Sequence, residues 1–138
     1  MEVNDPVSTI ISRPVIVANQ SHHFSEVLEL FSQHGRHHLP VVNDENHLIG
    51  IISTSDLLKL FYDPRFTNLT FNRAEIDSSL KLTDIMTPDP ITIASTETIE
   101  KAARLFTDHK IQCLPVVDNG ELTGIVTIKD LAQLVAYF

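Results

Sequence analysis

Two short segments of the chain place a hydroxyl side chain three residues before a carboxylate. Ser53 precedes Asp56, and Thr127 precedes Asp130. A carboxylate can accept hydrogen bonds from two vicinal hydroxyl groups, and the first turn of a helix offers free backbone N–H groups to an anion. The same spacing before an apolar run is also a capping box, which needs no ligand. Both segments are therefore candidates for ligand binding and for helix initiation, and the two roles are compatible.

Five histidines raise the question of a metal site: His22, His23, His34, His37 and His38. His34 and His38 are four residues apart and could share a metal ion if they lay on one helix. An apolar strand is expected directly after His38, however, so the helix has ended by then. No third ligand is evident, and we expect no metal site and no required cofactor.

The sequence carries no recognisable catalytic signature. Its only glycines are Gly35, Gly50, Gly120 and Gly124, so there is no glycine-rich phosphate loop. Neither a Gly-x-Ser-x-Gly elbow nor a His-Glu-x-x-His motif occurs. The Ser, His and Asp residues show no spacing that marks a catalytic triad. We therefore expect a protein that is not an enzyme.

Composition narrows the choice of partner. The 138 residues include 18 acidic and 10 basic side chains, which gives a formal net charge of -8. A surface of that sign repels phosphate backbones and anionic membranes, so neither nucleic acid nor membrane is expected as a partner. The apolar runs are too short to span a bilayer, and the N-terminus has no apolar stretch typical of a signal peptide. Because the only cysteine is Cys113, a reducing compartment fits, and we expect a soluble cytoplasmic protein.

The chain repeats itself once. Leu39-Pro40-Val41-Val42 returns 75 residues later as Leu114-Pro115-Val116-Val117. Gly50-Ile51-Ile52-Ser53 returns 74 residues later as Gly124-Ile125-Val126-Thr127. Two copies at such a long period indicate a duplicated half-domain rather than a solenoid.

Each copy is predicted to run strand, helix, strand, strand, helix. Extended apolar stretches open the copies at residues 15–17 and 91–93. Apolar residues then recur at helical spacing from Phe24 and from Ile99, with Thr98 as the N-cap of the second helix. Two short strands follow, and the final helices begin near Thr54 and Ile128. Repeat 1 is thus expected at 1–62 and repeat 2 at 82–138. The linker between them, 63–81, is expected to contain one short helix near 74–80.

These segments resemble the signature of the cystathionine-β-synthase (CBS) domain family. The second repeat carries it in order, from Asp84-Ile85-Met86-Thr87 through Leu114-Pro115-Val116-Val117 to the segment from Gly124 to Leu131. The first repeat keeps the later parts, but its opening, residues 8–14, is degenerate. The resemblance covers nearly the whole chain. It implies a mixed α/β (α+β) fold of two CBS repeats packed about a pseudo-twofold axis.

The resemblance also implies a function and a site. Members of the family commonly form disc-shaped homodimers, and their clefts bind AMP, ADP, ATP or S-adenosylmethionine. The aspartate accepts hydrogen bonds from the ribose, and the Ser/Thr hydroxyl lies near the phosphate. One cleft would combine Arg13, Val15 and Ala18 with Thr127 and Asp130. The other would combine Asp89, Ile91 and Ala94 with His38, Ser53 and Asp56. We therefore expect a regulatory ligand sensor, a homodimer with an unknown regulated protein partner.

Two departures from the family pattern keep an alternative open. The family often places an arginine just before the Leu-Pro-Val strand, where this chain has His38 and Cys113, and Cys113 is interpreted as a small apolar filler. The absence of both arginines favours a CBS-type dimerisation or interaction protein without a ligand. If ligand does bind, Arg13 could replace the missing arginine beside Asp130, whereas Asp89 repels phosphate. The Asp130 cleft should then dominate at pH 7, and the Asp56 cleft should strengthen towards pH 6 as His38 becomes protonated.

Overall fold

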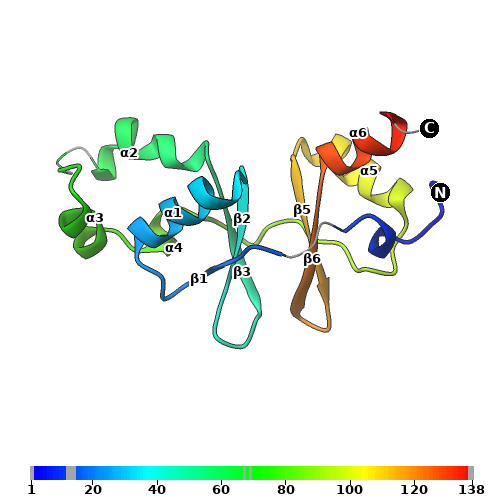
Figure 1. Ribbon diagram of the computed structural model, residues 1–138, viewed down its shortest axis with the longest axis horizontal. Coiled ribbons are helices and arrows are strands. Elements are labelled where there is room, and N and C mark those ends of the chain that lie inside the picture. The colour runs from blue at the N-terminus through cyan, green and yellow to red at the C-terminus, as the bar shows by residue number, and fades with distance from the viewer. Residues whose placement is uncertain (1, 12–14, 67, 69, 137–138) are drawn as a thin grey trace. The chain divides into compact units, whose positions relative to one another are not determined.

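The computed structural model describes residues 2–11, 15–66, 68 and 70–136 (Figure 1). The chain forms two compact units: unit 1 contains Met1–Val15 and Pro90–Phe138, and unit 2 contains Ile16–Asp89. The chain therefore passes from one unit to the other twice. The units do not coincide with the sequence repeats, since each takes in the opening segment of the other repeat. The expected repeat boundaries follow the sequence and stay a prediction.

Unit 2 is built on a four-stranded sheet in the order β1-β2-β3-β4. Strand β1 (Ala18–Asn19) pairs in parallel with β2 (His38–Val42), which forms an antiparallel hairpin with β3 (Leu48–Ser53). Helix α1 (Phe24–His34) connects β1 to β2. After β3 come the 3₁₀ helix η2 (Asp56–Leu58), α2 (Lys59–Tyr62), the 3₁₀ helix η3 (Pro64–Phe66), α3 (Arg73–Ser79), α4 (Leu82–Ile85) and the edge strand β4 (Thr87–Pro88).

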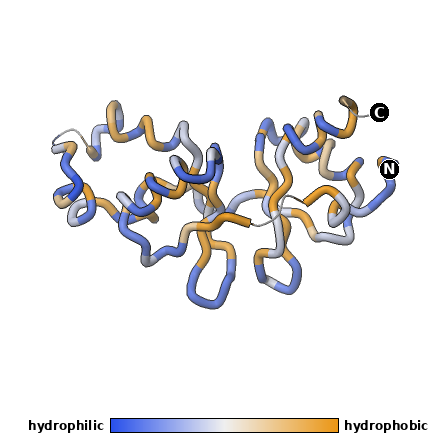
Figure 2. Tube along the Cα trace, viewed as in Figure 1, coloured by the Kyte–Doolittle hydropathy of each residue, from blue (hydrophilic) through white to orange (hydrophobic). Residues whose placement is uncertain are grey.

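Unit 1 has the same hairpin with fewer additions. Strands β5 (Cys113–Asp118) and β6 (Glu121–Thr127) pair antiparallel, and α5 (Ile99–His109) precedes them while α6 (Ile128–Ala136) follows. The 3₁₀ helix η1 (Val7–Thr9) belongs to this unit. Figure 2 shows apolar residues along the strands and hydrophilic residues at the hairpin tips. The predicted mixed fold of two strand-helix-strand-strand-helix repeats is confirmed.

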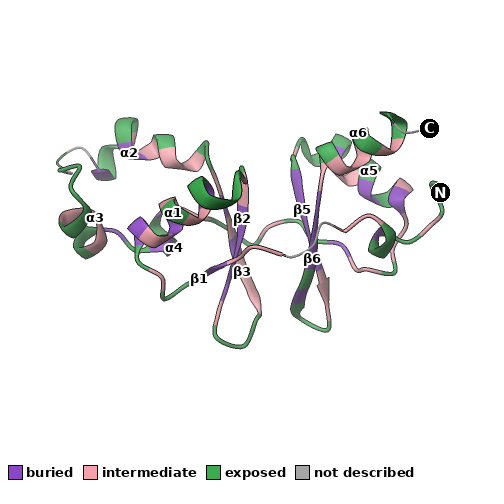
Figure 3. Ribbon diagram, viewed as in Figure 1, coloured by how far each residue is buried: buried purple, intermediate pink, exposed green. Residues whose placement is uncertain are grey.

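Helices α1 and α5 form where the sequence predicted them, and their apolar faces are buried as predicted. Phe24, Val27 and Phe31 of α1 are buried, and so are Ile99 and Phe106 of α5, as Figure 3 shows for both helices. The Thr98 hydroxyl accepts a hydrogen bond from the Lys101 backbone N–H at 3.1 Å, which confirms the predicted N-cap. Each helix ends in a left-handed residue: Gly35 at φ 58° after α1 and Lys110 at φ 52° after α5. That conformation costs glycine little, and it ends the helix in both repeats.

Two elements differ from the sequence expectation. In the first repeat, strand pairing falls later than the predicted stretch at 15–17, with Ala18 opposite Val41; in the second repeat, Ile93, the last residue of the predicted stretch, bridges Val116. The final helix of the first repeat is short and begins as the 3₁₀ turn η2, whereas α6 is a regular helix of 9 residues. Asp63-Pro64 explains the early end of α2, because the residue before a proline avoids helical backbone angles; Asp63 is extended at ψ 127°.

The opening segments fill matching places in the two units. Opening segment 1 (residues 7–11) packs in unit 1, and opening segment 2 (residues 82–88) packs in unit 2. Val7 and Leu82, 75 residues apart, are almost completely buried in the respective cores. Opening segment 2 also supplies β4, whose Thr87 and Pro88 pair with Ile51 and Gly50. The opening of the first repeat is degenerate in sequence but keeps this position.

Glycines make these contacts possible. A Cβ added at Gly50 would lie 2.5 Å from the Met86 Sδ and 2.9 Å from the Thr87 carbonyl oxygen. A Cβ at Gly124 would collide with the side chain of Ile11. Each glycine therefore leaves room for the opening segment that crosses it.

The linker is part of the unit 2 core. Phe66 and Leu80 are buried there, and α3 confirms the predicted short helix. Asp77 of α3 accepts hydrogen bonds from the Ser25 backbone N–H at 2.8 Å and from the Ser25 hydroxyl at 2.6 Å, which satisfies the start of α1. These bonds lower the pKa of Asp77.

We predict that Gly50→Ala destabilises the protein by about 1–3 kcal/mol, because the new methyl group overpacks against Met86 and the Thr87 backbone. Urea unfolding monitored by circular dichroism measures this cost. Met86→Ala removes one of the two colliding groups, so the cost of Gly50→Ala should be smaller in a Met86→Ala background. Strictly additive effects of the two substitutions would contradict the proposed contact.

Candidate functional site

In unit 2, three predicted site residues meet where β3 leads into η2. His38 lies opposite Ser53 in the β2–β3 hairpin. The Asp56 Oδ2 accepts a hydrogen bond from the Ser53 backbone N–H at 2.8 Å, and the Asp56 N–H donates to the Ser53 hydroxyl at 3.2 Å. We call His38, Ser53 and Asp56 the Asp56 half-site.

Unit 1 repeats this arrangement where β6 leads into α6. Cys113 lies opposite Thr127 in the β5–β6 hairpin. The Asp130 Oδ2 accepts from the Thr127 backbone N–H at 2.8 Å and from its hydroxyl at 3.1 Å, and the Asp130 N–H donates to the same hydroxyl at 3.3 Å. We call Cys113, Thr127 and Asp130 the Asp130 half-site.

The reciprocal bonds confirm that both segments are capping boxes. Capping uses Oδ2 of each aspartate in the bonds described above. A carboxylate offers roughly four lone-pair sites, so a cap does not exhaust its capacity to accept hydrogen bonds. Both aspartates remain half-buried rather than fully enclosed. The structural role is thus present in both copies.

A lysine that the sequence analysis missed joins the Asp56 half-site. The Lys59 ammonium lies 3.1 Å from the Asp56 Oδ1 and donates a hydrogen bond to the Ile85 carbonyl at 3.3 Å. The spacing of Asp56 and Lys59, three residues apart in a predicted helix, was enough to predict the ion pair. It could not predict the contact of Lys59 with Ile85. This cleft was expected to be the weaker one at pH 7 because Asp89 repels phosphate and His38 compensates only when protonated. Lys59 is a positive charge that this prediction did not include.

The two residues at the position of the missing arginine are both partly or fully buried. Burial lowers the pKa of His38, the neighbouring His37 lowers it further, and the Asp56 carboxylate raises it by a smaller amount. His38 therefore takes up its proton at a lower pH than the sequence analysis assumed. Burial, followed by the negative charge of Asp130, raises the pKa of the Cys113 thiol. The thiol stays protonated, which confirms the interpretation of Cys113 as an apolar filler.

The predicted contributors from the opening strands divide between the units. Val15, Ile91 and Ala94 belong to unit 1, whereas Ala18 and Asp89 belong to unit 2. Ala18 is fully buried. Ile91 is exposed, and Ala94 is half-buried. Arg13 lies outside the described residues. Each predicted cleft thus draws on both units, and the two clefts stay predictions.

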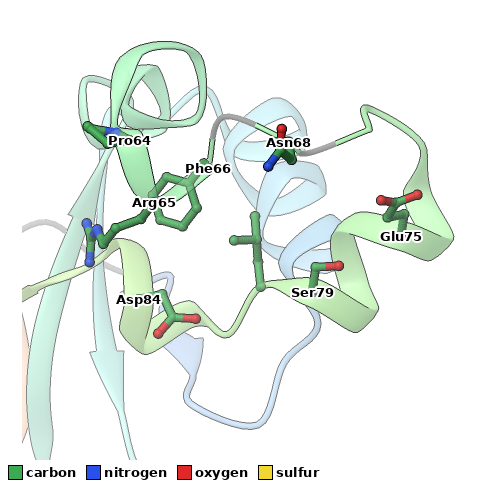
Figure 4. A pocket seen from close by; sticks show the side chains of 8 residues that line it. Pro64, Arg65, Phe66, Asn68, Glu75, Ser79 and Asp84 are labelled. Atoms are coloured by element: carbon green, nitrogen blue, oxygen red, sulfur yellow. The ribbon is translucent and has the colours of Figure 1, made fainter.

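A separate cavity of about 450 Å³ lies in unit 2, with Phe66 of η3 on one side and Ser79 of α3 on the other (Figure 4). Its lining contains no residue of the Asp56 half-site.

Within the described ranges, no group of three or more His, Cys, Asp or Glu side chains is placed to hold a metal ion. In that same part of the chain, every helix is too short or too polar to cross a bilayer.

The repeat architecture matches a known family. A family model described as the CBS domain matches residues 7–63 and 82–137. The chain belongs to the CBS-domain family. The membership predicted from the sequence is confirmed, and each matched CBS segment contains one half-site.

Relatives of this CBS chain include larger proteins. Protein MJ1225 of Methanocaldococcus jannaschii is 30% identical over 132 residues, which cover 96% of this chain and 43% of that protein. Inosine-5′-monophosphate dehydrogenase of Bifidobacterium longum is 37% identical over 101 residues, which cover 72% of this chain and 16% of the enzyme. The chain thus spans less than half of the length of these relatives, and the match to the enzyme covers only a small part of it.

Solved CBS structures share the fold. The structure of MJ1225 superposes with a TM-score of 0.85 at 32% identity, covering 98% of this chain and 49% of that chain. CBSX2, solved in complex with AMP, gives a TM-score of 0.79 at 29% identity, covering 96% and 97% of the two chains. The CBS domain pair of protein MJ0100, solved with 5′-methylthioadenosine and S-adenosylmethionine, gives a TM-score of 0.79 at 27% identity, covering 96% of each.

We predict that His38 makes the stability of the protein depend on pH. The folded state lowers the pKa of His38 from its ordinary value of 6.5, so the unfolded chain binds the proton first as the pH falls. Stability should therefore decrease as the pH falls through 6.5, until the folded state is also protonated. Urea unfolding at pH 7.5 and pH 5.5 should show a smaller difference for His38→Gln than for the wild type. An unchanged difference would show that His38 is not the responsible group.

Proposed function

We propose that this CBS chain is a regulatory module that binds an adenosine-containing ligand of the AMP, ADP, ATP or S-adenosylmethionine class. The observation that carries the proposal is the matched pair of hydroxyl–aspartate turns, each at the same point of its repeat. CBSX2 and the CBS domain pair of MJ0100, which share the fold over nearly the whole of the solved chains, were solved with ligands of this class. The aspartate would accept hydrogen bonds from the ribose hydroxyls, and the N-terminus of the following helix would face the phosphate.

The regulatory role follows from the absence of chemistry in these residues. The half-sites offer hydrogen-bond acceptors and charge, and the cysteine among them, Cys113, is buried with a raised thiol pKa, which disfavours a thiolate nucleophile. A ligand would act by binding one arrangement of the protein more tightly than another. The signal would pass to a regulated protein partner, in the cytoplasm, without catalysis by this chain.

A ligand-free interaction protein remains the second candidate, and one observation favours it. Cys113 occupies the position where the family often has an arginine, and it is buried and uncharged. The Asp130 half-site therefore has no cation at that position. Binding experiments separate the two candidates.

We predict that AMP or ADP raises the melting temperature of the wild-type protein, because a ligand that binds only the folded state stabilises it. Asp130→Asn and Asp56→Asn should each weaken binding at their own half-site by roughly tenfold or more, since a hydrogen bond to a charged group contributes about 1.5–3 kcal/mol. Titration calorimetry measures both. If no adenosine ligand binds the wild type, the ligand-free alternative is correct.

We also predict a homodimer. The final helices of both repeats expose apolar side chains: Phe61 of α2 is 72% exposed and Val135 of α6 is 80% exposed. A twofold interface would bury such side chains against their copies. Phe61→Asp and Val135→Asp should each shift the mass measured by light scattering towards the monomer. Val3→Asp, at another exposed valine, serves as the control and should leave the mass unchanged.

A further inference from the structure

Lys59 is held in place by contacts to two different elements of unit 2. Its ammonium group pairs with the Asp56 Oδ1 at 3.1 Å and donates to the carbonyl of Ile85, the last residue of α4, at 3.3 Å. The side chains of Lys59 and Asp56 are only 27% and 13% exposed. Partial burial limits screening by solvent, so the charge of Lys59 interacts more strongly with a nearby ligand than a fully exposed charge would. A permanent positive charge therefore stands beside the aspartate of the Asp56 half-site.

The pairing changes the charge that a ligand meets at this half-site. Asp56 keeps its Oδ2 on the Ser53 backbone, while Lys59 balances the negative charge from the Oδ1 side. His38, the other titratable member of the half-site, has a lowered pKa and adds no permanent charge. The residue that corresponds to Lys59 in the second repeat, 74 residues later, is the neutral Gln133. The two repeats thus differ in charge at this position, and they also differ at Ser55, whose counterpart is Lys129.

We propose that Lys59 makes the Asp56 half-site select among adenosine ligands by the charge of their 5′ substituent, favouring phosphate over sulfonium. This inference rests on the proposed function. The ligands that distinguish it share the adenosine group and differ at the 5′ position. AMP carries a phosphate with about -1.5 to -2 charges at pH 7, S-adenosylmethionine carries a sulfonium cation, and 5′-methylthioadenosine is uncharged there.

The physical reason is the short distance between the ribose and its 5′ substituent. The 5′ group is only a few bonds away from the ribose hydroxyls. When an aspartate accepts hydrogen bonds from those hydroxyls, the 5′ group therefore lies near the carboxylate and near its ion-pair partner. With Lys59 present, a phosphate meets a cation and a carboxylate whose negative charge is balanced by that cation. Without Lys59, the phosphate meets an uncompensated carboxylate, whereas a sulfonium cation loses a like-charge neighbour.

The test measures the affinities of AMP, 5′-methylthioadenosine and S-adenosylmethionine by titration calorimetry at pH 7. All proteins carry Asp130→Asn, so that binding is measured at the Asp56 half-site. Lys59→Gln introduces the residue of the second repeat, and Lys59→Met keeps the aliphatic stem without the charge. Lys101→Gln is the matched control, because Lys101 forms a similar 3.1 Å ion pair with Glu97 in unit 1. Melting temperatures confirm that each variant is folded.

Lys59→Gln and Lys59→Met should weaken AMP binding by roughly tenfold, leave 5′-methylthioadenosine nearly unchanged and strengthen S-adenosylmethionine binding. Lys59→Arg should keep the preference of the parent protein, and Lys101→Gln should change none of the three affinities. Equal changes for all three ligands would show that Lys59 only supports the fold of the half-site, which overturns this inference and leaves the proposed function intact. Absence of binding by all three ligands to the wild-type protein without Asp130→Asn would overturn the proposed function itself, and this inference with it.

Discussion

The close approach of an opening segment to a glycine on the second hairpin strand is the contact on which both units depend. Gly50 accommodates Met86 and Thr87, and Gly124 accommodates Ile11. Without a side chain at these positions, the crossing segment can lie directly on the hairpin, and Val7 or Leu82 can reach the core. The same strands then run into the turns that carry Asp56 and Asp130. In each unit, one strand therefore carries the glycine that packs against the opening segment and also positions the aspartate that follows it.

The aspartates combine structure and proposed function in a single side chain. Oδ2 of each fixes the turn at the start of the following helix. This capping orients the carboxylate in advance, so a ligand would not have to pay for ordering it. The two copies differ in their surroundings, with Lys59 and half-buried His38 near Asp56 and buried Cys113 near Asp130. A duplicated motif has thus kept its backbone geometry while its charges have diverged.

Local patterns predicted most of the fold, because local physics decides those features. The apolar stripes of α1 and α5, the Thr98 cap, the hairpins and both capping boxes follow from residues only a few positions apart. The opening-strand register, the burial of the linker and the contact of Lys59 with Ile85 depend on residues distant in sequence. Sequence spacing could not show which segment lies over Gly50, nor that burial would lower the pKa of His38.

The exchange of opening segments has a consequence for the assembly of such a chain. A single repeat on its own would lack the segment that covers its hairpin glycine, because that segment comes from the other repeat. In the present chain, unit 1 unites residues near both ends of the sequence. Contacts of such high contact order form slowly, so we expect unit 1, which needs Ile11 to meet Gly124, to fold more slowly than unit 2.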